Sequence, residues 1–168
     1  MNKSVSFQAK NIALLTIAAF SLIESQATAQ AIIPPDKESL LKGLGMGLAS
    51  YAEENNYPGP KHVLDLKEQL ALSRDQIKKA ETLANLVNIS AVAKGEEIVQ
   101  AEEELNKMFE EGKINEKSLR PKLEQIGKLR ADLRFIHLQA HLRMKQILSA
   151  DQIKQYNELR GHEANQQN

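Results

Sequence analysis

Two histidines and a methionine share one face of a predicted helix in the C-terminal half of the chain. His137 and His141 are four residues apart, so both imidazole rings emerge on the same side, and Met144 follows about one turn later. This spacing suits a divalent transition metal such as Zn, Cu, Ni or Co. A metal site needs three or four ligands, so the others would come from His62, His162 or a second subunit. The alternative is that the histidines are amphipathic residues at the rim of a packing seam.

A seven-residue segment occurs twice in the chain. Residues 72–78 (LSRDQIK) recur as residues 148–154 (LSADQIK) with one difference. In each copy a serine can cap the third backbone N–H of a helix, and a glutamine can reach back to the N–H of that serine. A leucine before the serine and an isoleucine after the glutamine supply a hydrophobic staple. The copies therefore predict two helix starts, built from Leu72, Ser73, Gln76, Ile77, Leu148, Ser149, Gln152 and Ile153.

Apolar residues recur at steps of three and four from residue 61 onward, which is the period of a helix. The expected helices cover residues 61–70, 73–110, 118–148 and 149–160. We expect Ser118 to be the N-cap of the third helix, with Pro121 in its first turn, and Gly161 to end the last helix. The second and third helices carry heptad-like seams. The predicted fold class is therefore all-α, with a long antiparallel helical hairpin and short flanking helices.

The first 29 residues have the three parts of a secretory signal peptide in the expected order. Lys3 and Lys10 make the start basic, residues 12–23 are apolar, and Ala27-Thr28-Ala29 fits the cleavage pattern. The apolar run is shorter than the roughly 20 residues that cross a membrane as a helix. We therefore expect cleavage after Ala29, export to the periplasm and no stable membrane insertion.

The exported part divides into an arm, a helical domain and a tail. Residues 30–60 are expected to form a flexible or loosely helical arm, because Gly43, Gly45 and Gly47 each weaken a helix by about 1 kcal/mol. Pro58-Gly59-Pro60 breaks any helix and is expected to act as a hinge. The helical domain then covers residues 61–161, and residues 162–168 form a disordered tail.

The composition of the chain and the motifs that it does not contain argue against several classes of function. The chain has 22 basic and 22 acidic residues, so nothing indicates nucleic-acid binding. It contains no cysteine, which excludes a thiol nucleophile, a thiolate zinc site and disulfides. The sequence contains no nucleophile elbow, zinc-protease motif or phosphate loop. We therefore expect a binding protein and not an enzyme.

A second apolar row lies opposite the seam of the third helix. Phe135, Leu138 and Leu142 are spaced i, i+3 and i+7, and a hairpin seam cannot cover both faces of a helix. Surplus apolar surface of this kind marks a homodimer interface or a surface for client proteins, and both remain open. A weaker matching row on the second helix consists of Leu83, Leu86 and Ile89.

The paired boxes resemble the LTxxQ motifs of the Spy/CpxP family, with serine where threonine is more frequent. Residues 57–62 (YPGPKH) and 137–142 (HLQAHL) are similar to the broader group of refolding chaperones and heavy-metal sensors. The resemblance covers residues 46–161 approximately, and it implies a curved helical-hairpin homodimer in the periplasm. Its implied partners are unfolded or misfolded envelope proteins or a stress-sensor domain. We expect an ATP-independent chaperone or envelope stress-response binding protein, with heavy-metal binding or sensing as the alternative.

Overall fold

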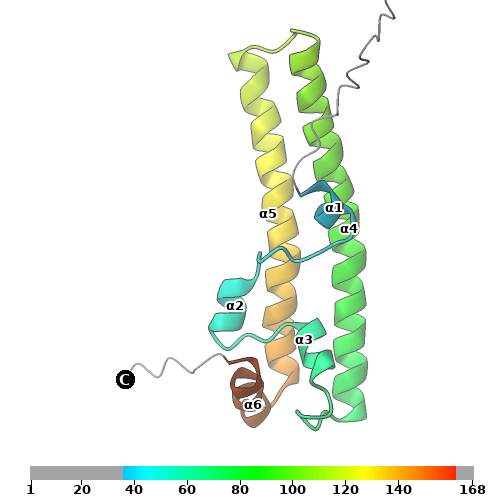
Figure 1. Cartoon of the computed structure of the whole chain (residues 1–168), viewed down its shortest axis with the longest axis vertical. Coiled ribbons are helices and arrows are strands. Elements are labelled where there is room, and N and C mark those ends of the chain that lie inside the picture. Colours follow the sequence, from blue (N-terminus) through cyan, green and yellow to red (C-terminus); the bar gives the residue numbers. More distant parts are fainter. Residues whose placement is uncertain (1–35, 162–168) are drawn as a thin grey trace, which may run out of the picture. The chain divides into compact units, whose positions relative to one another are not determined.

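The computed structural model describes residues 36–161, which contain helices and no strand. The predicted signal peptide, the start of the arm and the predicted tail lie outside the described residues. The helices are α1 (Lys37–Leu41), α2 (Ser50–Glu54), α3 (Pro60–Asp65), α4 (Arg74–Glu110), α5 (Glu116–Ile147) and α6 (Ala150–Arg160), as Figure 1 shows. The predicted all-α class is confirmed. None of these described helices is long and apolar enough to cross a membrane.

The two long helices, α4 and α5, pack against each other and are joined by residues 111–115 (Figure 1). Ion pairs cross between them at several levels. Lys122 Nζ lies 2.6 Å from Glu104 Oε2, and Arg130 Nη2 lies 2.9 Å from Glu102 Oε1. Ion pairs that are partly open to solvent contribute little to stability, typically below about 1 kcal/mol each. They do show which levels of the two helices face each other.

The core consists of two apolar clusters along the helical pair. The first joins α3, α4, α5 and α6, and its buried members are Val63, Leu70, Ala80, Leu83, Ala140, Met144, Leu148 and Tyr156. The second lies where α1 covers the pair and contains Leu40, Ala91, Ile98, Val99 and Leu133. Small residues at the helix contacts let the backbones approach, while the leucines and isoleucines fill the space between them. The short helices therefore complete the core of the long ones.

The start of α5 differs from the prediction. Its N-cap is Asn115 and not Ser118: Asn115 Oδ1 accepts a hydrogen bond from the Ser118 N–H at 3.2 Å. Ser118 Oγ in turn accepts from the Asn115 N–H at 3.0 Å, so the two residues form a reciprocal capping box. Asparagine caps as well as serine, and here it gains this second bond. Pro121 consequently lies one turn deeper in the helix than predicted, on its exposed side.

The arm packs on the helical pair over the part that the structure describes. Leu40 of α1 is 1% exposed and lies against α4. A Cβ atom on Gly95 would come within 2.2 Å of the Leu40 carbonyl oxygen, so only glycine permits this approach of α1 to α4. Asp36 Oδ2 accepts a hydrogen bond from Arg130 at 2.7 Å, which ties the start of the described arm to α5. The arm is therefore helical in short pieces, and α1 is held by specific contacts.

The predicted hinge is also packed. Pro58, Gly59 and Pro60 are all buried, and Pro60 is the first residue of α3. That helix is shorter than predicted, because it ends at Asp65 and turns follow over residues 66–70. Proline at the first helical position is compatible with a helix start, since its missing N–H would have no partner there. The Pro-Gly-Pro segment therefore begins a helix inside the fold.

Candidate functional site

Both repeated boxes cap helices in the structure. Ser73 Oγ accepts a hydrogen bond from the Gln76 N–H at 3.2 Å, and Gln76 Oε1 accepts from the Ser73 N–H at 3.0 Å. Ser149 and Gln152 repeat this arrangement at the start of α6 with the same two distances. Each box therefore satisfies two backbone N–H groups that a helix start leaves without partners.

The two boxes also bind each other, which the sequence alone did not indicate. Gln76 Nε2 donates to Gln152 Oε1 at 2.8 Å, and Gln152 Nε2 lies 3.2 Å from Gln76 Oε1. Gln76 further donates to the carbonyl of Ile147, and Gln152 donates to the carbonyl of Leu70. We call this reciprocal pair the glutamine clasp. It joins the start of α4 to the junction of α5 and α6.

Loss of either serine hydroxyl is expected to weaken the fold and to leave binding unaffected below the melting point. Ser73→Ala and Ser149→Ala should each lower the free energy of unfolding by about 1 kcal/mol, because each removes one N-cap acceptor. Chemical denaturation followed by circular dichroism measures this loss. Ser90→Ala, at an exposed position inside α4, is the matched control and should change stability little. A serine variant that melts normally and yet loses binding would show that the box contacts the ligand.

The predicted histidine pair lies on the face of α5 that the arm covers. His137 and His141 are each 8% exposed. His141 Nδ1 donates to the carbonyl oxygen of Tyr57 at 2.7 Å, so its Nε2 carries the lone pair when the ring is neutral. His137 Nε2 is buried and has no hydrogen-bond partner among the described residues. Burial, with the neighbouring His141 adding to it, lowers the pKa of His137 and keeps this ring neutral at neutral pH.

Met144 does not join the histidines as an accessible group. Its side chain is 0% exposed and belongs to the core cluster that also contains Leu83 and Ala140. His62 lies on α3, where its Nδ1 is 2.5 Å from Glu53 Oε1. Within residues 36–161, no group of three or more histidine, cysteine, aspartate or glutamate side chains has an arrangement that could hold a metal ion. The four candidate ligands therefore do not form one ligand set in the described chain.

Glu53 is the centre of a polar cluster that the sequence analysis missed. Besides His62, its carboxylate accepts a hydrogen bond from the Tyr156 hydroxyl at 3.3 Å and lies 3.4 Å from Arg160 Nη2. A Cβ atom on Gly59 would lie 2.9 Å from Glu53 Oε1 and 3.2 Å from His141 Nε2, so this glycine leaves room for the cluster. The cluster connects α2 to α3 and α6. A carboxylate in a five-residue helix gives no periodic signal that could have identified it.

The ionisation of the cluster follows from its contacts. Burial raises the pKa of Glu53, but the hydrogen bond from His62 and the charges of His62, His141 and Arg160 outweigh burial, so the pKa lies below 4.5. Burial and the charge of Glu53 raise the pKa of Tyr156, so its hydroxyl stays protonated and donates to the carboxylate. Glu53 is therefore ionised at neutral pH and holds the short helices through charge-assisted bonds.

Acid is expected to remove the stabilisation from Glu53. Because its folded-state pKa lies below the unfolded value of 4.5, the contribution is present above pH 4.5 and is lost as the pH falls through the folded pKa. Melting temperatures of the wild type and of Glu53→Gln, recorded from pH 7 to pH 3, measure the effect. The wild type should lose more stability over this range, because the variant lacks this titration. Parallel curves for the two proteins would contradict the assignment.

The predicted apolar row on α5 is largely accessible. Phe135 is 60% exposed and Leu142 is 51% exposed, while Leu138 between them is half-buried. The matching row on α4 divides: Leu83 is only 6% exposed and belongs to the core, whereas Leu86 and Ile89 are exposed. Leu83 packs in the core cluster that also contains Met144 of α5. The row on α5 therefore keeps all three of its members at least partly accessible, and the row on α4 keeps two.

Comparisons of this chain with family models, curated proteins and solved structures found no match. The similarity to the Spy/CpxP family rests on the two Leu-Ser-x-x-Gln boxes and on residues 57–62 and 137–142. That similarity is one basis of the function proposed below.

Proposed function

We propose that this protein is a periplasmic, ATP-independent chaperone or envelope stress-response binding protein of the Spy/CpxP type. It would hold unfolded or misfolded envelope proteins, or a stress-sensor domain, on an apolar surface. No catalytic step is proposed. The exposed row on α5 carries this proposal, because a long packed helical pair with accessible aromatic and leucine side chains provides a binding surface.

The exposed row is more than scattered surface leucines. Single exposed apolar residues are common on soluble proteins and need no explanation. Phe135, Leu138 and Leu142, by contrast, follow one another along a single face of α5. Apolar surface of this kind is favourable to cover, by roughly 25 cal/mol for each Å² removed from water. A second subunit, a client protein or both in adjoining positions would cover it, as in a curved homodimer.

Two further features support the family assignment. The paired boxes resemble the LTxxQ motifs, and in this chain their glutamines form the clasp that joins the start of α4 to the junction of α5 and α6. The N-terminal 29 residues have the pattern of a cleaved signal peptide, which would place the mature protein in the periplasm. Mass spectrometry of the exported protein should then give an N-terminus at Gln30. An uncleaved chain in the membrane fraction would contradict this localisation.

The proposed activity is tested by suppression of client aggregation without ATP. Purified protein is added to a chemically unfolded model client diluted into buffer, and light scattering is followed with and without added Zn²⁺ or Cu²⁺. The chaperone proposal predicts that scattering falls with increasing protein in the absence of metal. Stoichiometric metal binding together with no suppression would instead favour the heavy-metal alternative, with ligands shared between subunits.

A further inference from the structure

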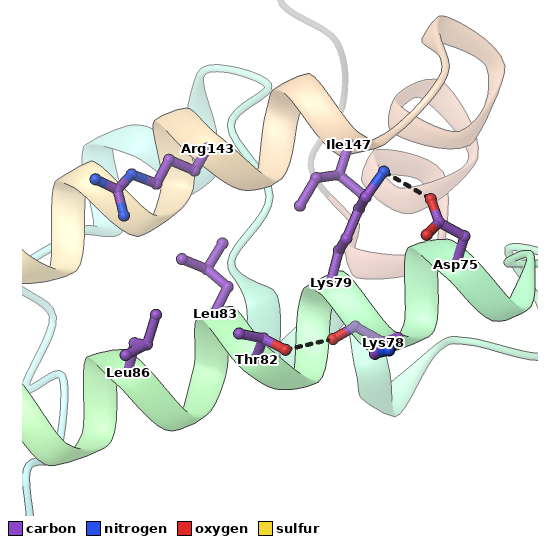
Figure 2. A pocket seen from close by; sticks show the side chains of 8 residues that line it. All are labelled: Asp75, Lys78, Lys79, Thr82, Leu83, Leu86, Arg143 and Ile147. Atoms are coloured by element: carbon purple, nitrogen blue, oxygen red, sulfur yellow. Dashed lines mark hydrogen bonds and ion pairs between the residues drawn. The ribbon is translucent and has the colours of Figure 1, made fainter.

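A groove lies between α4 and α5, and the exposed row on α5 contributes nothing to it. It is a shallow groove that is largely open to solvent, with a volume of about 430 Å³. All of its lining residues belong to the two long helices. They are Asp75, Lys78, Lys79, Thr82, Leu83, Leu86, Arg143 and Ile147, which Figure 2 shows as sticks.

The apolar part of the groove comes from three side chains. Leu83 is 6% exposed and Ile147 is half-buried, so both present part of the core to the groove. Leu86 is 51% exposed and extends the apolar surface along α4. Figure 2 shows Leu83 and Leu86 on α4 and Ile147 across from them on α5. These three side chains together provide apolar contact for part of a hydrocarbon chain.

The polar part of the groove has an excess of positive charge. Three cationic side chains line it, against one carboxylate. Lys79 Nζ is paired with Asp75 Oδ2 at 2.6 Å, which neutralises that carboxylate (Figure 2). Neither Lys78 nor Arg143 forms an ion pair with any residue of the described chain. Two cations are therefore available beside an apolar surface.

We propose that this groove binds a free, single-chain anionic amphiphile, such as a long-chain carboxylate. The hydrocarbon chain would lie on Leu83, Leu86 and Ile147, and the anionic head group would pair with Arg143. Arginine suits this role because its guanidinium donates two parallel hydrogen bonds to one carboxylate. The excess of cations beside three apolar side chains matches the anionic head and the apolar tail of one such molecule. A neutral amphiphile would leave both cations without a partner.

Titration calorimetry with sodium dodecanoate, below its micelle concentration, tests this site. The wild type should bind dodecanoate saturably, with one site per chain. Arg143→Glu and Leu86→Ser should each weaken binding at least about tenfold, because one reverses the charge and the other removes apolar contact. Lys154→Glu on α6 is the matched charge-reversal control and should bind normally. The Leu138→Ser/Leu142→Ser variant should also bind normally, which separates this site from the proposed client surface.

Several results would overturn the proposal. Dodecanoate that fails to saturate, or that binds Arg143→Glu and Leu86→Ser as it binds the wild type, rules out this groove. Equal affinity for the uncharged dodecyl maltoside would show that the cations have no part. Binding of an acidic amphipathic peptide or of phosphatidylglycerol vesicles, without binding of dodecanoate, would assign the groove to a protein or membrane surface. If circular dichroism shows that Leu86→Ser is unfolded, Arg143→Glu and Lys78→Glu decide the question.

Discussion

Leu133→Ala is expected to lower the free energy of unfolding by about 2 to 5 kcal/mol. Leu133 is 3% exposed and packs in the cluster that contains Leu40, Ala91, Ile98 and Val99. The substitution removes buried methyl groups at the point where α5, α4 and α1 meet. The resulting cavity adds to the lost transfer free energy, because the surrounding helices relax only in part. Urea denaturation followed by circular dichroism measures the change.

Leu123→Ala on the same helix is the matched control for this prediction. Leu123 is 49% exposed, so the same chemical change removes much less buried area. Its cost should be well below that of Leu133→Ala and close to the roughly 0.5 kcal/mol of ordinary surface substitutions. Equal losses at the two positions would mean that α5 does not pack on α4 through the face that contains Leu133.

The Leu138→Ser/Leu142→Ser variant is expected to lose association while keeping its helices. Leu142 is 51% exposed and Leu138 is half-buried, so most of the removed apolar area faces outward. If this row is a homodimer interface, the dissociation constant should rise at least about tenfold, because the two substitutions remove apolar area that association would bury and a tenfold change needs only about 1.4 kcal/mol. Analytical ultracentrifugation measures the dimer, and circular dichroism measures the helices.

Two controls keep this experiment interpretable. Leu159→Ser changes a leucine of similar exposure, 47%, on α6 and should leave association unchanged. Leu142→Ser alone isolates the more exposed position of the pair. If the double variant has a much lower melting temperature and yet associates normally below that temperature, the row belongs to the internal core. The chaperone proposal would then rest on resemblance alone.

Helix starts with local signals could be predicted from the sequence, because a cap depends on residues within one turn. The boxes at Ser73 and Ser149 cap α4 and α6 as predicted. The prediction from local signals was wrong at α5. Ser118 was predicted to be the N-cap, whereas the N-cap in the structure is Asn115. Two adequate caps lay three residues apart, and the reciprocal box that both residues form decided between them.

Contacts between distant segments were not predicted, because they depend on how the helices pack and not on residues within one turn. The glutamine clasp joins residues 76 positions apart, and Glu53 contacts Arg160 across 107 positions. The repeated glutamine was the only signal for the clasp. Identical boxes at adjacent ends of a hairpin could have suggested that the two side chains meet. For Glu53 the sequence offered no comparable signal.

The burial of the histidine pair also depends on contacts between distant segments. Their common face on α5 followed from their spacing, but their burial depends on the arm, which has no helical period. Tyr57 of that arm accepts the hydrogen bond from His141, and this contact fixes the tautomer of the ring. Neither the metal site nor amphipathic histidines at the rim of the seam included burial beneath the arm, and metal binding stays a prediction.

Aggregation suppression by matched variants tests whether the exposed row on α5 binds unfolded protein, as we propose. Wild type, Leu138→Ser/Leu142→Ser and Leu159→Ser are compared at equal concentration and equal helicity, without ATP or metal. The proposal predicts that wild type and Leu159→Ser suppress light scattering of the unfolded client, and that the double variant loses most of this activity. Suppression by the double variant equal to that of the wild type would contradict the claim.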